Sequence, residues 1–136
     1  MSEERLHACL ASRRWARAVA AGADPDAAMD DLTDDEWLEA MKAHPRIGER
    51  GSADSTREQS RAMQAAPETL ADLAAENRRY EDRFGHVFLI FASGRNAEEI
   101  LAELRRRMKN DPATELQEAK RELRKIAHLR LEKVLP

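Results

Sequence analysis

Apolar residues recur every three to four positions along most of this chain, and only one short segment could form a β-strand. That segment, residues 86–92, is an almost uninterrupted apolar run. A single strand has no partner with which to build a sheet, so we expect 86–92 to be helical or a buried extended segment. The 136 residues include only five Gly and five Pro, while Ala, Leu, Glu and Arg are abundant. The sequence therefore predicts an all-α fold.

Capping residues, together with Pro and Gly, mark where the predicted helices begin and end. The predicted segments are one or two helices over 3–21, one from the capping box of Thr33 and Glu36 to His44-Pro45, one from Ser55 to about Ala66, one from Pro67 to Phe84, one capped by Asn96, and one from Asp111-Pro112 to about Val134. No internal repeat or long linker divides the chain. We expect a single compact domain over residues 1–136, with about seven or more helices around one core.

Charge and composition exclude several classes of protein. The net charge is −3, from 23 basic and 26 acidic side chains, which argues against a nucleic-acid-binding protein. The basic run Arg105–Lys109 is expected to be the solvated face of a helix. No segment approaches the roughly 18 consecutive apolar residues of a membrane span, and the N-terminus has no signal-peptide pattern. Residues 134–136 do not form a peroxisomal address. The single Cys9 suits a reducing compartment, so we expect a cytoplasmic protein without a disulfide.

A histidine beside a proline is the first candidate for chemistry. His44 precedes Pro45, which fixes its own φ and biases His44 away from helical backbone. Imidazole is the side chain whose ordinary pKa permits proton transfer near neutral pH. We therefore expect His44 to be held in a defined position as a proton donor or acceptor, although a turn histidine without chemistry fits the same pattern.

A carboxylate follows at Glu58, within the motif Ser55-x-x-Glu58-Gln59. The spacing of Ser55 and Glu58 satisfies the capping-box pattern without any function. A helix N-terminus is also a site for anions and polar ligands, so the two interpretations are compatible. The neighbouring amide of Gln59 can both donate and accept hydrogen bonds.

Arg130 interrupts the apolar face of the last predicted helix. At about 100° per residue, one apolar arc surrounds it, formed by Leu116, Ala119, Leu123, Ile126, Ala127 and Val134. Burying an unpaired guanidinium is costly, so Arg130 needs an anionic or carbonyl partner. Two interpretations stay open. Arg130 belongs to an internal ion pair or extends to the edge of the core, or it binds a ligand at the floor of a pocket.

The sequence offers no metal-binding pattern. His7, His86 and His128 share no metal-ligand spacing, and one cysteine cannot build a zinc site. We therefore expect no metal ion.

Four motifs occur together across most of the chain: Ala43-His44-Pro45-Arg46-Ile47-Gly48, Ser55-x-x-Glu58-Gln59, Tyr80-x-x-Arg83-Phe84-Gly85-His86-Val87-Phe88, and Ile126-Ala127-His128-Leu129-Arg130-Leu131. In this order they resemble the 2-oxo-4-hydroxy-4-carboxy-5-ureidoimidazoline (OHCU) decarboxylases, which act in the third step from urate to S-allantoin. Many members have a larger apolar residue or a proline near His86-Val87. The first helices are also shorter here than in longer members of the family.

The resemblance implies a role for each candidate residue. His44 is the catalytic acid or base, and Glu58 and Arg130 complete the catalytic set. The residues implied to line the substrate site are Pro45, Ser55 and Gln59, with the backbone of Phe88, Leu89, Ile90 and Phe91. The resemblance also implies an all-helical homodimer that takes OHCU as its small-molecule substrate and needs no cofactor.

Decarboxylation of OHCU fits a site without a cofactor. The carbon that bears the carboxylate adjoins a ring C=N, so the electrons left by departing CO₂ can move into that imine. The protein has to orient the carboxylate, stabilise the developing charge and deliver a proton to one face. Delivery to one face yields a single enantiomer.

Two other functions remain compatible with the sequence. One is a helical protein-interaction module without catalysis, with His44 in a turn and Arg130 in a structural ion pair. The other is a family member that acts on a different ureido acid.

Overall fold

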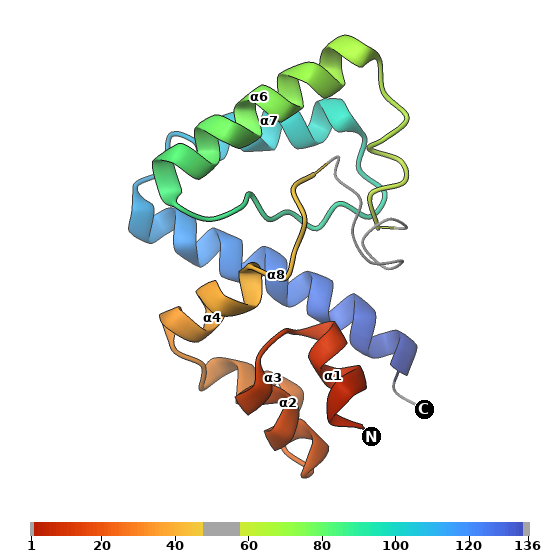
Figure 1. The fold of residues 1–136 in the computed structure, drawn as a ribbon, viewed down its shortest axis with the longest axis vertical. Coiled ribbons are helices and arrows are strands. Elements are labelled where there is room, and N and C mark those ends of the chain that lie inside the picture. The colour runs from red at the N-terminus through yellow and green to blue at the C-terminus, as the bar shows by residue number, and fades with distance from the viewer. Residues whose placement is uncertain (1, 48–57, 135–136) are drawn as a thin grey trace. The chain divides into compact units, whose positions relative to one another are not determined.

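Seven α-helices and no strand are found in this computed structural model, which describes residues 2–47 and 58–134 (Figure 1). In chain order the helices are α1 (Glu3–Cys9), α2 (Arg13–Ala20), α3 (Pro25–Asp30), α4 (Asp34–Met41), α6 (Pro67–Phe84), α7 (Ala97–Arg107) and α8 (Pro112–Val134). The predicted all-α fold is confirmed. The helix predicted from Ser55 starts outside the described residues, and its predicted continuation over 59–66 is wrong, because none of these residues is helical.

The described residues group into two compact units. The first unit comprises Met1–Ala43 with Arg124–Pro136, and the second comprises His44–Leu123. Helix α8 contributes its first half to the second unit and its second half to the first. The assignment of residues 1–136 to one domain stays a prediction.

Side-chain caps explain where helices begin. The predicted capping box of α4 is present: the Glu36 N–H donates to Thr33 Oγ1 at 3.2 Å, and the Thr33 N–H donates to Glu36 Oε1 at 3.0 Å. Asn96 caps α7 in the same way. Helix α3 is absent from the predicted helices, because a Pro after Asp also fits the end of the preceding helix. In the structure, Asp24 Oδ2 accepts from the Ala27 N–H at 3.0 Å, so the same two residues begin a helix.

The apolar run 86–92 takes the extended alternative rather than the helical one. Helix α6 ends where Gly85 adopts φ = 80°, a left-handed conformation that glycine allows without steric cost. From residue 87 to 92 the chain lies outside any helix and runs as an open trace (Figure 1). Phe88, Leu89 and Ile90 are buried along it.

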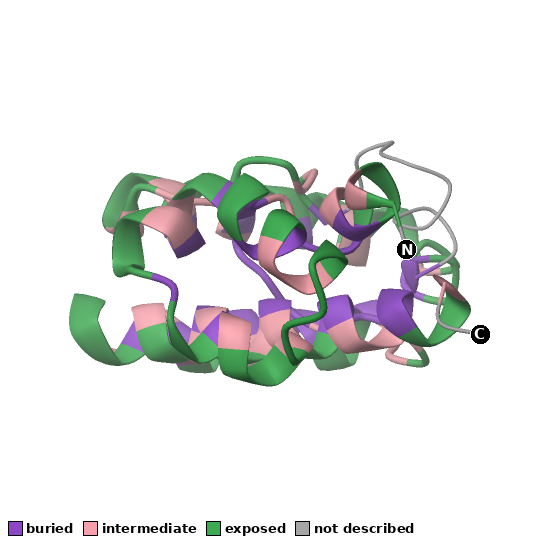
Figure 2. Ribbon diagram, turned by 90° about the horizontal axis from the view of Figure 1, so that it is seen from below, coloured by how far each residue is buried: buried purple, intermediate pink, exposed green. Residues whose placement is uncertain are grey.

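Each helix buries one stripe of its surface. Figure 2 shows buried and exposed positions alternating along the helices, as amphipathic sequences require. In the second unit, α6 and α7 pack together over a core formed by Ile47, Ala62, Leu73, Tyr80, Phe88, Ile90, Ala92, Ile100, Leu101 and Leu104. In the first unit, Trp15 and Trp37 are buried, and the Trp15 indole N–H donates to the Pro25 carbonyl at 3.0 Å. None of the described helices has the length and apolar character to cross a membrane.

Candidate functional site

The predicted site residues fall in both units. Those in the second unit are His44, Pro45, Glu58, Gln59 and residues 88–91. Arg130 belongs to the first unit. Ser55 lies outside the described residues, so its place in the site stays a prediction.

The chain after His44 and Pro45 is fixed by helix α6. The Asn77 side-chain amide donates to the Ile47 carbonyl at 3.4 Å, and Asn77 itself is only 2% exposed. Arg46 Nε donates to Glu81 Oε2 at 2.6 Å. Since Asn77 and Glu81 are one helical turn apart, a single face of α6 holds both residues that follow Pro45. His44 and Pro45 are half-buried.

Glu58 and Gln59 are withdrawn from solvent. Their exposed fractions are 9% and 7%, well below what a purely solvated capping residue requires. Charged and amide side chains are buried only when other polar groups satisfy them. The burial of both residues therefore agrees with a polar site, while the capping role of Glu58 toward Ser55 stays a prediction.

Most side chains of the segment 88–91 are buried in the core. Phe88, Leu89 and Ile90 are at most 3% exposed, and the Phe88 ring meets the Tyr80 ring edge-on at 5.2 Å. The Phe91 N–H donates to Glu122 Oε1 at 3.0 Å. With three of the four side chains buried, the backbone and the half-buried Phe91 ring are the parts of this segment that remain available for a ligand.

Arg130 is buried as its position on the apolar arc predicted. The residue is 8% exposed, and its helical neighbours Ile126 and Ala127 are buried too. Arg130 Nη1 donates to the Ala8 carbonyl at 3.3 Å, which supplies the carbonyl partner that burial demands. The ligand-binding role of Arg130 stays a prediction.

The basic run Arg105–Lys109 contains one buried residue, so its interpretation as a solvated face is wrong for Arg107. Arg105 and Arg106 are exposed, but the Arg107 side chain is 1% exposed and pairs with Glu115, which is 0% exposed. Arg107 lies three residues after the buried Leu104, on the apolar face of α7. The helical periodicity that identified Arg130 therefore also contained the signal for Arg107.

His86 belongs to an aromatic cluster. Its ring stacks on Phe84 at 6.4 Å and meets Tyr80 edge-on at 5.5 Å. Its Nδ1 lies 3.0 Å from the Val87 carbonyl. The imidazole of His86 therefore packs among aromatic rings at the end of α6.

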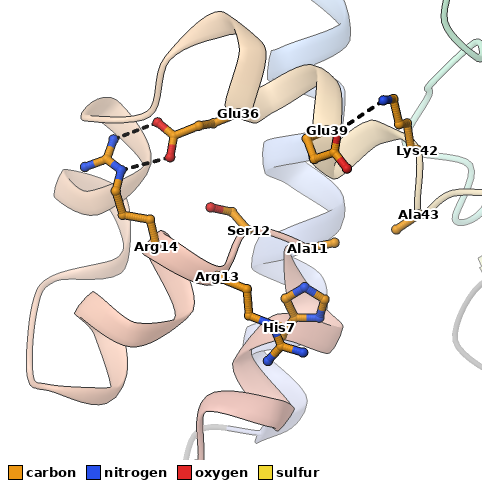
Figure 3. A pocket seen from close by; sticks show the side chains of 9 residues that line it. All are labelled: His7, Ala11, Ser12, Arg13, Arg14, Glu36, Glu39, Lys42 and Ala43. Carbon is orange, nitrogen blue, oxygen red and sulfur yellow. Dashed lines mark hydrogen bonds and ion pairs between the residues drawn. The ribbon is translucent and has the colours of Figure 1, made fainter.

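A cavity of about 600 Å³ occupies the first unit, and Figure 3 shows the side chains that line it. Four of its charged groups form two pairs: Arg14 Nε donates to Glu36 Oε2 at 2.8 Å, and Lys42 donates to Glu39 at 3.1 Å. None of the predicted site residues lines this cavity. Among residues 2–47 and 58–134, no three His, Cys, Asp or Glu side chains group as a metal ion would require.

Known proteins resemble this chain over most of its length. The sequence profile of the OHCU decarboxylase family matches residues 2–132. A uric acid degradation bifunctional protein of Arabidopsis thaliana is 40% identical over 108 residues, which are 73% of this chain and 33% of that protein. The 2-oxo-4-hydroxy-4-carboxy-5-ureidoimidazoline decarboxylase of Amia calva is 36% identical over 104 residues, which are 70% of this chain and 59% of that protein. This chain thus spans less than two thirds of the length of either curated relative.

The fold is shared as well. The crystal structure of an OHCU decarboxylase in the presence of (S)-allantoin superposes with a TM-score of 0.85 and 32% sequence identity, covering 98% of both chains. The sequence motifs, the helical fold and the family profile agree, and the chain belongs to the OHCU decarboxylase family.

Proposed function

We propose that this protein decarboxylates OHCU to S-allantoin and CO₂ in urate degradation. The match to the solved OHCU decarboxylase over 98% of both chains carries this proposal. The burial of Glu58, Gln59 and Arg130 supports it, since these polar side chains are the ones expected to hold the substrate.

His44 delivers the proton. The C–C bond to the carboxylate breaks, CO₂ leaves, and the electron pair moves into the neighbouring ring C=N. His44 then protonates the ring carbon that bears the ureido group on one face, while the hydroxyl on the decarboxylated carbon becomes a carbonyl and its proton passes to the ring nitrogen, so that one enantiomer forms. A positioned general acid contributes a factor of about 10²–10⁴ to the rate. The anchoring of Arg46 and Ile47 by α6 supports this role, because it fixes the chain directly after His44 and Pro45.

Glu58 and Arg130 act on charge and orientation. Glu58 accepts hydrogen bonds from the ureido N–H groups of the substrate. Arg130 stabilises the negative charge that develops on the ring or ureido oxygens. An arginine that gripped only the departing carboxylate would stabilise the ground state and slow the reaction.

The remaining predicted residues line the site. Pro45, Ser55 and Gln59 contact the substrate, and the backbone of residues 88–91 forms another wall. The burial of the side chains of Phe88, Leu89 and Ile90 supports recognition through the backbone.

We further propose that the reaction needs no cofactor, that the protein is a homodimer and that it is cytoplasmic. The electron sink within OHCU itself supports the first point. The homodimer rests on resemblance to the family. The cytoplasmic location is supported by the content of one cysteine, Cys9, which suits a reducing compartment.

The decay of OHCU ultraviolet absorbance with and without the protein tests the proposal. We expect the protein to accelerate the decay well beyond the spontaneous rate, in proportion to its concentration. Decay at the spontaneous rate would contradict it. Turnover of another ureido acid instead would then identify a family member with a changed substrate, and no turnover at all would favour an interaction module.

A further inference from the structure

Arg107 and Glu115 form a buried ion pair that the proposed chemistry does not use. Arg107 Nε lies 3.1 and 2.9 Å from the two carboxylate oxygens of Glu115, and the side chains are 1% and 0% exposed. Replacing such a pair by apolar residues is often neutral or stabilising, so stability alone is a weak reason for it. A fixed, buried, multidentate arginine is suited to holding another group in place.

The group that Arg107 holds is the backbone of the segment 88–91. Arg107 Nη1 donates to the Leu89 carbonyl at 2.6 Å, and the guanidinium carbon lies 4.5 Å from the centre of the Phe88 ring. Because no strand occurs among the described residues, this open segment has no sheet partner for its peptide groups. Side chains take that place: Glu122 accepts from the Phe91 N–H at 3.0 Å, and Arg95 Nε donates to the Phe91 carbonyl at 3.1 Å.

Glu115 is itself fixed from two further directions. The Tyr80 hydroxyl donates to Glu115 Oε2, and the Asn110 amide donates to Glu115 Oε1 at 3.1 Å. Burial and the bond to Glu115 raise the pKa of the Tyr80 phenol, which keeps it protonated as a donor. Burial alone lowers the pKa of Arg107, but its bonds to Glu115 raise that pKa above the ordinary value, so the guanidinium stays charged.

This network sets the direction of the Ile90 peptide groups. In a planar trans peptide the C=O of one residue and the N–H of the next point in opposite directions, and the described chain has no cis peptide. Arg107 binds the Leu89 carbonyl, so the Ile90 N–H points away from Arg107. Glu122 binds the Phe91 N–H, so the Ile90 carbonyl points away from Glu122. Ile90 therefore turns its donor and its acceptor away from the charged groups that hold its neighbours.

We propose that Arg107, held by Glu115 and Tyr80, is a positioning residue that fixes the 88–91 backbone for catalysis. The proposal rests on the proposed function, in which this backbone lines the substrate site. Arg107 touches no substrate and acts through the Leu89 carbonyl.

Arg107→Lys tests the proposal, with Arg106→Lys as the matched control. Lysine keeps the positive charge beside Glu115, but one ammonium group cannot reproduce the planar fork that reaches both Glu115 and Leu89. Arg106 neighbours Arg107 on α7, but its side chain is 51% exposed and pairs with Glu118 and Glu103. The two readouts are kcat and KM for OHCU per folded molecule, and hydrogen exchange of the amides of residues 89–91.

In Arg107→Lys we expect kcat to fall about 10- to 100-fold with a smaller change in KM, because misplaced binding groups cost mainly in the transition state. Exchange at 89–91 should accelerate while amides of α1 and α2 keep their wild-type rates. Arg106→Lys should match wild type in both readouts. If either readout stays at the wild-type value in Arg107→Lys, or if Arg106→Lys shows the same changes, the positioning role is overturned and the pair is structural only.

If Arg107→Lys does not fold, Tyr80→Phe tests the proposal by the same two readouts. Tyr80→Phe removes one hydroxyl donor from Glu115 and leaves no buried charge without a partner. We then expect the same direction of change in kcat and in the exchange at 89–91, and wild-type values of both would overturn the positioning role. Failure of the proposed function can be told apart from failure of the positioning role of Arg107. A wild-type protein that does not turn over OHCU removes the proposed function, and the exchange rates alone then show whether Arg107 fixes the segment.

Discussion

Buried charge marks a small group of side chains. In the part of the chain that the structure describes, the buried charged residues are Glu58, Arg107, Glu115 and Arg130. Arg107 and Glu115 neutralise each other, whereas Glu58 and Arg130 are the predicted catalytic partners of His44. Proteins retain buried charge where structure or function requires it. Burial is shared by the structural pair and the predicted site residues, so the catalytic roles of Glu58 and Arg130 stay predictions.

At the scale of single residues, His44→Asn should remove most activity and leave the fold intact. Asparagine keeps a polar side chain of related size but cannot transfer a proton near neutral pH, so we expect kcat to fall by a factor of about 10²–10⁴. Thermal melting should stay close to wild type. The control is His128→Asn, because His128 pairs with Asp26 at the surface. Wild-type turnover by folded His44→Asn would end the assignment of His44.

Arg130→Met separates a ligand-binding arginine from a structural one. Methionine keeps the apolar stem and removes the guanidinium, so activity should collapse while the free energy of unfolding holds or rises. OHCU assays and chemical unfolding measure the two effects. A loss of roughly 3–5 kcal/mol of stability with unchanged specific activity would show that Arg130 only satisfies a buried partner.

The sequence predicted the burial of Arg130 but not that of Arg107, and the difference has a physical reason. Periodicity identified Arg130 as buried because its helical neighbours are apolar. The same argument was available for Arg107, but the adjacent exposed Arg105 and Arg106 made the whole run look solvated. The carbonyl partner of Arg130 is Ala8, 122 positions away, and no local pattern identifies a contact at that separation.

At the scale of elements, capping chemistry was the most reliable guide. The capping box of Thr33 and the cap at Asn96 were predicted, and both are present, with Asn96 also forming a box with Glu99. Two elements could not be assigned from the sequence: helix α3 was not predicted, and the segment 86–92 was compatible with both a helix and an extended chain. A Pro after Asp ends one helix and begins another with equal ease, and a short apolar run suits both helix and extended chain. In each case tertiary packing decides.

The start of α4 should be acid-sensitive. A hydrogen bond from Arg14, followed by one from the Thr33 backbone, lowers the pKa of Glu36 from 4.5 to about 2. Because the folded pKa is the lower one, ionised Glu36 stabilises the fold above about pH 4.5, and this contribution disappears as the pH falls toward 2. Unfolding measured from pH 7 to 2 should therefore show Glu36→Gln less stable than wild type at neutral pH, with the gap closing in acid.

The effect should be modest, since Arg14 and Glu36 lie at the surface and solvent screens them. Glu39→Gln is the control. The side chains of Glu39 and its partner Lys42 are 70% and 75% exposed, so solvent screens this ion pair more strongly than the pair of Glu36 and Arg14. A gap between wild type and Glu36→Gln that does not change with pH would refute the assigned cause.

At the scale of the whole molecule, activity should survive chelation. The sequence contains no metal-ligand spacing, and OHCU carries its own electron sink. Activity measured before and after dialysis against EDTA should be equal within error. Loss of activity that one divalent metal restores would overturn the cofactor-free mechanism.

The handedness of the product tests the central claim most directly. Spontaneous decay of OHCU gives allantoin without a preferred hand, whereas protonation by a fixed group on one face gives one enantiomer. Circular dichroism of the product formed from fresh OHCU should therefore show S-allantoin, appearing faster than spontaneous decay with wild-type protein and only weakly with His44→Asn. Racemic allantoin appearing at the spontaneous rate with wild-type protein would contradict the account.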